Sequence, residues 1–263
     1  MNNQVKTSTV FWIMVKRDLV IQLRNWAEFI FRVAMLPFIL ILTYGYVLPK
    51  IGILSEDFPN QMFPGMIGMS LLITGIHGTA VPLSMDFNNS REIEDRLQAP
   101  VSIKVTAWSK MVVGIIESWI GALIVSPVSV IFMGSYLNFS MTSVDILQLI
   151  LILLISSVTS ATLGLLVGTI VKPMQIAAMF PGFLMPIIFT GAIFFNWASL
   201  SAIPVMKGLV LLNPLVYINE ALRSTMIETS DAMPIWLSLG GIVVFTLVMG
   251  IVGMKRFKKM AAR

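Results

Sequence analysis

Long stretches of nearly uninterrupted apolar residues set the strongest limit on how this chain can fold. Six of them reach about 20 residues, the length that an α-helix needs to cross the hydrocarbon core of a bilayer. Charged residues make up only 12% of the sequence, against about 25% in a soluble domain. Because a helix satisfies its own backbone hydrogen bonds, it is the natural way for such stretches to cross lipid. The sequence therefore predicts an all-α integral membrane protein.

One segment does not fit the pattern of long spans and short polar loops. The six expected spans cover residues 28–48, 63–85, 107–133, 145–171, 174–195 and 233–254. Residues 196–232 are apolar but interrupted by Ser, Lys and Pro, and no piece is long enough to cross. Asn213 followed by Pro214 predicts that a helix begins inside this segment. We therefore expect residues 1–263 to form one transmembrane domain, with re-entrant or external helices between spans five and six.

The first helical pattern, residues 9–26, is amphipathic rather than uniformly apolar. Trp12 and Trp26 stand near its ends, while Arg17 and Asp18 belong to its polar surface. A basic amphipathic helix with tryptophans at both ends suits the plane of the membrane interface. The alternative is a soluble helix packed on a core, but no soluble core follows it. We expect an interfacial helix.

The densest run of charge lies between the second and third spans. Asn89 and Glu92 have the spacing of a capping box, opposite charges recur four residues apart, and Pro100 ends the pattern. These features predict a short helix over residues 88–100, whose apolar stripe is too narrow for a core but fits a groove on another protein. A solvated loop helix is the alternative. The residues expected to make the contact are Asn89, Arg91, Glu92, Ile93, Glu94, Asp95, Arg96, Leu97 and Pro100.

Basic residues gather at one set of span ends. Six spans place both termini on the same side, and of 18 Lys and Arg residues only Lys50, Lys207 and Arg223 fall on the opposite side. Because basic residues are retained on the cytoplasmic side of a membrane, both termini are expected to be cytoplasmic. This distribution accounts for the net charge of +5, so membrane lipid and not nucleic acid is the expected partner.

Few residues could carry chemistry inside the membrane. The chain has one His, no Cys and no Gly-rich nucleotide-binding loop, so neither a metal site nor a catalytic residue is predicted. His77, between Gly75 and Gly78, either hydrogen-bonds across a tight helix contact or relays protons. Glu117 either pairs with a polar neighbour or lines a substrate path.

Several motifs in the second half of the chain resemble a known family. They are Phe-Pro-Gly at 180–182, Pro-Ile-Ile-Phe-Thr-Gly at 186–191, Pro204, and Asn-Pro-Leu-Val-Tyr-Ile-Asn-Glu-Ala-Leu-Arg at 213–223. Together they resemble the C-terminal signature of ABC-2 type permeases. The charged stretch resembles the cytoplasmic coupling segment of the same family, and the interfacial helix and six spans agree along the whole chain. Nodulation-factor, daunorubicin and polysaccharide exporter permeases are the most similar groups.

The resemblance implies a permease subunit of an ATP-driven exporter with no ATPase site of its own. Two permease copies, identical or close paralogues, would pair with two ABC ATP-binding subunits, which would hold ATP and Mg while this chain holds no cofactor. The complex would sit in the cytoplasmic (inner) membrane of a prokaryote. Drug-like molecules, lipids or lipid-linked glycans would leave between the two copies.

The resemblance also implies that the segment after the fifth span closes the path at the outer face. The residues expected in the substrate path or outer gate are His77, Glu117, Phe189, Phe194, Phe195, Asn213, Pro214, Tyr217, Glu220 and Arg223. Two other classes remain open. One is a gradient-driven secondary carrier that uses His77 and Glu117 within the membrane, and the other is a membrane scaffold that transports nothing.

Overall fold

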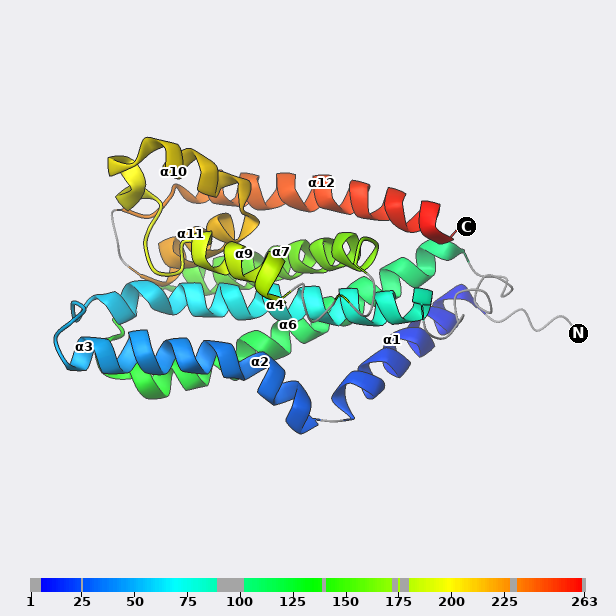
Figure 1. Ribbon diagram of the computed structural model, residues 1–263, viewed down its shortest axis with the longest axis horizontal. Helices are drawn as coiled ribbons and strands as arrows, with labels where there is room; N and C mark the ends of the chain where they lie inside the picture. Colours follow the sequence, from blue (N-terminus) through cyan, green and yellow to red (C-terminus); the bar gives the residue numbers. More distant parts are fainter. Residues whose placement is uncertain are drawn as a thin grey trace, which may run out of the picture.

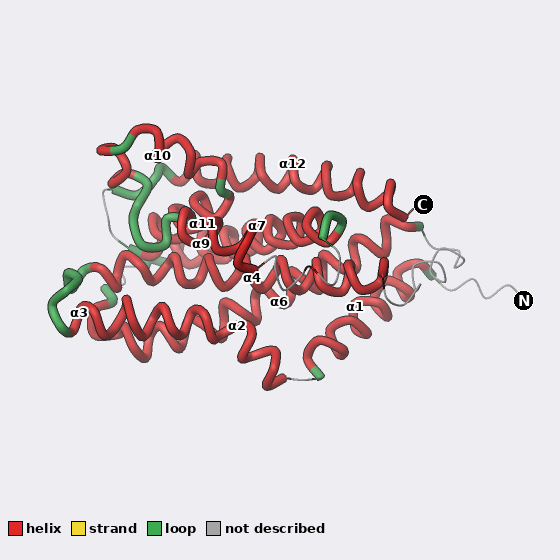
Figure 2. The backbone as a smooth tube through the Cα atoms, in the orientation of Figure 1, coloured by secondary structure: helices red, strands yellow, loops and turns green. Residues whose placement is uncertain are grey.

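The computed structural model describes residues 6–24, 26–88, 102–138, 141–171, 175, 180–227 and 231–261. The expected coupling contacts at 89–100 lie outside these residues, as do 172–174 and 176–179 around the start of the expected fifth span. Every regular element in the described part of the chain is helical, with no strand (Figure 2). The predicted all-α membrane fold is confirmed.

The long helices run side by side along the length of the molecule (Figure 1). They are α2 (Trp26–Leu40), α4 (Phe58–Asn88), α6 (Ile103–Met133), α7 (Ser143–Gly168) and α12 (Ile235–Ala261), preceded by the oblique α1 (Thr7–Leu23). Helix α2 continues through a π-helix, η1 (Ile41–Val47), into α3 (Leu48–Lys50). At one end of the bundle α4 and α12 finish while α1 and α6 begin, and we call it the basic end.

Helix α4 is the centre of the bundle. The most apolar stretch of α4 is 89% buried within the chain, whereas that of α12 is only 11% buried. Glycines let its neighbours approach closely: a Cβ atom on Gly78 would lie 2.7 Å from the Glu117 carboxylate of α6. A Cβ atom on Gly164 of α7 would lie 2.9 Å from the Ile76 carbonyl oxygen. The residues around the expected intramembrane site are therefore packed between helices.

Five described helical segments are long and apolar enough to cross a membrane. They are Trp26–Lys50, Phe58–Phe87, Lys104–Tyr136, Ser143–Gly168 and Ile235–Met260. The described part of the expected fifth span is shorter and consists of η4 (Phe180–Leu184) and α9 (Met185–Thr190). Residues after it fold into η5 (Ala198–Ala202), α10 (Pro204–Leu209), η6 (Val210–Leu212) and α11 (Pro214–Met226). The Pro204–Leu212 and Pro214–Met226 pieces meet at 100°, the shape of a broken span or re-entrant loop.

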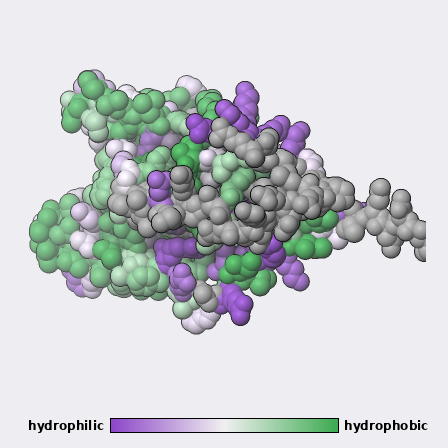
Figure 3. Space-filling view, turned by 45° about the vertical axis from the view of Figure 1, so that its right-hand side comes forward, coloured by the Kyte–Doolittle hydropathy of each residue, from purple (hydrophilic) through white to green (hydrophobic). Residues whose placement is uncertain are grey.

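The outer surfaces of the bundle are apolar, as contact with lipid or with another membrane protein requires. Large side chains such as Leu147 on α7 and Leu247 on α12 are 70% and 58% exposed. In the space-filling view, green apolar surface dominates the left part, and purple residues gather near the middle, above and below the grey atoms (Figure 3). The chain therefore buries polar groups inside and presents apolar groups outside.

Candidate coupling site and outer segment

A buried ion triad joins three helices at the basic end. The Lys110 Nζ atom on α6 lies 2.7 Å from Asp18 Oδ2 on α1 and 2.8 Å from Asp86 Oδ2 on α4. The Lys110 side chain is fully buried, and both carboxylates are nearly so. Arg17 Nε, 3.6 Å from Asp18 Oδ1, supplies a second positive charge beside Asp18. A buried charge is tolerated only when it is paired, so the three helix ends are held in one relative position.

The triad corrects the expected role of Asp18. The sequence placed it on the polar surface of the interfacial helix, yet it is only 3% exposed, whereas Trp12 is 60% exposed. The buried side of α1 instead runs through Val15, Asp18 and Gln22, whose spacing puts them on one helical face. The Gln22 side chain donates a hydrogen bond of 3.3 Å to the Gly78 carbonyl oxygen on α4. Helix α1 is therefore bound to the bundle by polar contacts, and its one tryptophan, Trp12, is exposed.

The triad also flanks the charged stretch on both sides. Asp86 precedes residue 89 by about one helical turn. Lys110 lies about two turns after Ile103, the first residue of α6. One residue after Asp86, the Phe87 ring contacts the Phe257 ring of α12 edge to face, with centroids 5.6 Å apart. A displacement of the charged stretch would therefore reach α1, α4, α6 and α12 within a few residues.

A second polar cluster lies deeper in the bundle. Glu117 on α6 is fully buried, and neither of its carboxylate oxygens has a hydrogen-bond partner among the described residues. The expected polar partner of Glu117 is thus missing from the described part of the chain. Arg32 on α2 is within electrostatic reach of both Glu117 and His77, which is 8% exposed on α4. The bundle therefore keeps an ionisable group in an apolar setting, which is costly and typical of functional positions.

The far end of the bundle contains a buried pair of another kind. Glu220 and Arg223, one turn apart on α11, form an ion pair and are at most 1% exposed. The Glu220 carboxylate also accepts hydrogen bonds from the backbone N–H groups of Trp197 (2.9 Å) and Met233 (2.8 Å). The Arg223 guanidinium donates to the carbonyl oxygens of Gln61 (3.2 Å) and Ala192 (2.8 Å). The pair therefore fixes the loops on either side of α11 and the start of α4.

Two asparagines add to these contacts at the far end of the bundle. We call the contacts of Asn213, Asn219, Glu220 and Arg223 together the outer network. The expected cap is confirmed: the Asn213 side chain accepts from the Leu215 N–H at 2.9 Å, with Pro214 in the first turn. The Asn213 amide group also donates to the Ile187 carbonyl oxygen at 2.7 Å. Asn219 donates to the Gly191 carbonyl oxygen at 2.6 Å. The backbone between α9 and η5 is therefore held by side chains of α11.

The aromatic residues predicted for the gate divide into two groups. Phe189 and Phe194 stack with ring centroids 5.9 Å apart, and Phe194 lies 5.2 Å from the ring of Tyr44 in η1. Phe195 packs instead in a separate apolar cluster that includes Val210 of η6 and Val216 of α11. The Tyr217 hydroxyl donates to the Leu211 carbonyl oxygen at 3.0 Å and so supports the outer network.

The residues predicted for a substrate path do not form one site. Arg223 contacts Gln61 near the start of α4, and His77 lies sixteen residues further along that helix. At 1.5 Å per residue this is a separation of about 24 Å. His77 and Glu117 therefore belong to an inner cluster, and Asn213, Glu220 and Arg223 belong to the outer network.

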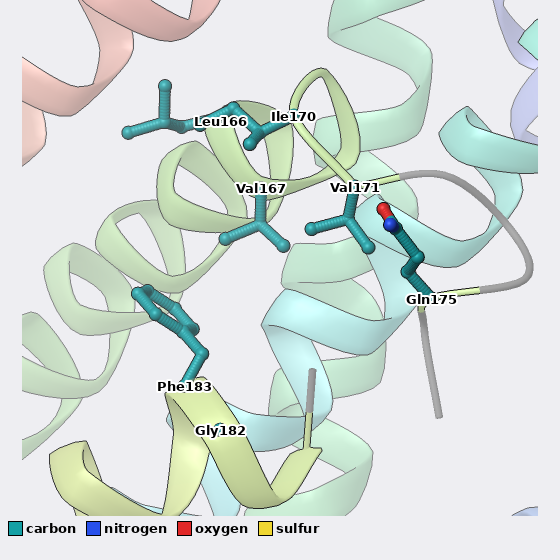
Figure 4. Close-up of a pocket in the computed structure, with 7 residues that line it drawn as sticks. All are labelled: Leu166, Val167, Ile170, Val171, Gln175, Gly182 and Phe183. Atoms are coloured by element: carbon teal, nitrogen blue, oxygen red, sulfur yellow. The ribbon is translucent and has the colours of Figure 1, made fainter. Parts of the chain in front are cut away.

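An apolar cavity of about 410 Å³ lies between the end of α7 and η4 (Figure 4). It is lined by Leu166, Val167, Ile170, Val171, Gln175, Gly182 and Phe183. Its lining suits hydrocarbon rather than a charged group.

Sequence reasoning missed the residues that hold the basic end together. From the sequence, Asp86 is expected at the end of a span, where water is near, and Lys110 is expected among the basic residues of one membrane face, but the two are buried and paired. The available signal was the helical spacing of Val15, Asp18 and Gln22, which marks a single face. No signal along the chain paired that face with Lys110, because the contact joins separate helices.

The fold and its polar clusters define a polytopic helical membrane protein with a buried ion triad at one end of the bundle and a buried polar network at the other. Residues 9–227 match the family model of the ABC-2 type transporter. The chain therefore belongs to the ABC-2 type transporter family and is a permease of the ABC type. No curated protein matches it significantly.

Proposed function

We propose that this chain is the membrane-embedded half of an ATP-driven exporter. Two copies, identical or paralogous, combine with two ABC ATP-binding subunits that carry ATP and Mg. The family match over residues 9–227 carries the proposal, because ABC-2 permeases normally work with a separate ATP-binding subunit. The basic residues at one end support an inner membrane orientation with cytoplasmic termini.

In this proposal the charged stretch at 89–100 docks onto the ATP-binding subunit. Closure of the ATPase dimer moves the stretch, and the Asp18–Lys110–Asp86 triad carries that movement into α1, α4 and α6. The distances of 2.7 and 2.8 Å support a rigid connection, since two helices cannot separate there without exposing a buried charge. The helices then rock as units, the usual form of a two-state transition in packed bundles.

The exported molecule passes between the two copies and leaves past the outer network and Phe189. A drug-like compound, a lipid or a lipid-linked glycan fits this proposal, because the outer faces of the bundle are apolar and the cavity between α7 and η4 is lined mainly by hydrocarbon. The outer network keeps its shape while the helices rock, since its hydrogen bonds lie within one segment and the start of α4.

The decisive test is co-purification followed by ATP hydrolysis. Tagged chain extracted from native membranes is expected to carry a stoichiometric ATP-binding subunit. Leu97→Asp should remove that subunit and abolish transport while membrane insertion stays intact, because a carboxylate cannot seat in an apolar groove. Leu97→Met, which keeps the apolar side chain, is the matched control. A tag that recovers no nucleotide hydrolase would contradict the proposal.

A gradient-driven carrier is the second candidate, and one observation favours it. The Glu117 carboxylate is buried without a hydrogen-bond partner among the described residues, as in a site that exchanges a proton. In that case transport into vesicles would stop on addition of an uncoupler, would need no ATPase, and would be lost in Glu117→Gln. ATP-dependent transport that survives the uncoupler excludes this candidate.

A further inference from the structure

A groove on the outside of the bundle lies between α6, α7 and α12 near the basic end. Its volume is about 430 Å³. It is lined by Trp108, Met111, Val158, Thr162, Thr246, Leu247, Gly250, Ile251, Met254, Lys255 and Lys258. It runs along α12 through side chains three and four residues apart, so it follows the long axis of a membrane-spanning helix. This is also the direction in which lipid acyl chains lie.

The hydroxyl groups in the groove wall are already engaged. Thr162 donates to the Thr159 carbonyl oxygen at 2.8 Å, and Thr246 donates to the Ile242 carbonyl oxygen at 2.8 Å. Thr246 and Thr159 also share a hydrogen bond of 2.6 Å between their hydroxyls. A polar solute would therefore find few free hydrogen-bonding groups along the wall, whereas a hydrocarbon chain needs none.

The groove changes character at the basic end. Lys255 and Lys258 are both exposed on one side of α12, and neither forms an ion pair with any residue that the structure describes. Trp108, 51% exposed, lies opposite on α6. Trp and Lys are the residues that mark the level of lipid headgroups at the end of a span. An apolar slot thus opens directly onto two positive charges.

We propose that this groove binds an anionic phospholipid. One acyl chain lies along α12 between Leu247 and Met254, and the phosphate is held by Lys255 and Lys258 beside Trp108. Basic pockets between membrane helices at the headgroup level are known to select anionic lipids. A second copy of this chain fits less well, because none of the described residues that line the groove is acidic and could meet the two lysines. This site goes beyond the proposed export function and does not depend on it.

The same helical turns of α12 provide a matched control. Arg256 and Lys259 face a different, smaller pocket of about 310 Å³, which they line together with Thr169 and Met260. Removing these two charges changes the net charge by as much as removing Lys255 and Lys258 does. It leaves the apolar groove and its two lysines intact. A lipid held only by general attraction to basic residues would respond equally to both changes.

The test is native mass spectrometry of the full-length chain in detergent, titrated with dioleoyl phosphatidylglycerol or dioleoyl phosphatidylcholine. Lys255→Gln with Lys258→Gln should weaken binding of the anionic lipid about ten- to thirtyfold, since each lysine near the headgroup contributes about a factor of five. Arg256→Gln with Lys259→Gln should weaken it less than about threefold. Phosphatidylcholine should bind weakly and respond little to either pair.

Gly250→Leu tests the acyl-chain part of the site. A Cβ atom at Gly250 would sit 3.4 Å from Thr162 Cγ2, an ordinary contact, so a leucine fits the backbone and fills the groove. It should lower phosphatidylglycerol binding about tenfold without changing any charge. Equal losses in both charge variants, or no loss in Gly250→Leu, would overturn the proposal.

A cysteine cross-linking experiment tests whether a second copy of the chain occupies the groove instead. The chain has no cysteine, so Ile251→Cys, with a parent side chain 55% exposed, introduces a single thiol into the groove. The proposal expects this thiol to give no disulfide-linked dimer on oxidation. A near-complete disulfide dimer would show that the face is an interface between copies and would refute the lipid site.

Discussion

The two buried ion clusters of this permease are both made of paired charges, but they hold together different parts of the molecule. The triad at the basic end draws Asp18, Asp86 and Lys110 from three separate helices, whereas Glu220 and Arg223 are one turn apart on a single helix. The first joins elements that can move relative to one another, and the second fixes the loops around one segment. The role of a buried charge pair therefore depends on whether its residues come from one helix or from several. This difference can be tested by removing charges at each end of the bundle.

Lys110→Met is expected to have the largest effect. It leaves the Asp18 and Asp86 carboxylates buried beside each other without their shared cation, which costs about 3–5 kcal/mol. The variant should lose most of its folded population in a thermal unfolding assay in detergent.

The triple change Asp18→Asn, Asp86→Asn and Lys110→Met serves as the control. It removes all three charges, so stability should largely return. ATPase activity and export should nevertheless stay uncoupled if the charges transmit movement. Recovery of both stability and coupled export would show that the triad only supports the fold.

Arg223→Met should have a smaller and more local effect. Glu220 keeps its two backbone N–H partners, so about 2–3 kcal/mol is expected instead of a global collapse. Hydrogen exchange should rise around Ala192 and Trp197, while amides of α1 and the first turns of α6 stay protected. Increased exchange at the basic end would mean that the two regions are coupled and that the comparison is wrong.

The sequence predicted the helical class and the Asn213 cap, because each depends on residues close together along the chain. It could not predict the triad, since hydropathy treats Asp18 and Lys110 as surface residues and only packing brings them together. It also grouped Glu117 with Arg223, although about 24 Å of α4 separates their levels. The residues that share one face of a helix can be predicted from their spacing in the sequence. The helices that contact one another cannot, because packing of the whole bundle decides it.

Asn213→Ala probes the outer network at a single cap. Loss of the bond to the Leu215 N–H should cost about 1 kcal/mol, and loss of the bond to the Ile187 carbonyl oxygen adds to it. Asn213→Asp keeps the capping oxygen but cannot donate, so it should fall between wild type and alanine in thermal unfolding. Equal stability of all three would show that the cap does not hold the segment.

Phe189→Ala should change stability least, because the side chain is 53% exposed and makes its described ring contact only with Phe194. A loss below about 0.5 kcal/mol is expected, as for other surface substitutions. If the exported molecule passes this ring, export should fall several-fold while ATP hydrolysis continues. This result would distinguish a defect in the substrate path from a defect in the ATP-binding subunit. The matched variant Phe183→Ala removes a ring of similar exposure, 40%, from the neighbouring η4 segment. Equal losses in both variants would point to general packing near α9, and a loss confined to Phe189→Ala would place the substrate beside the outer network.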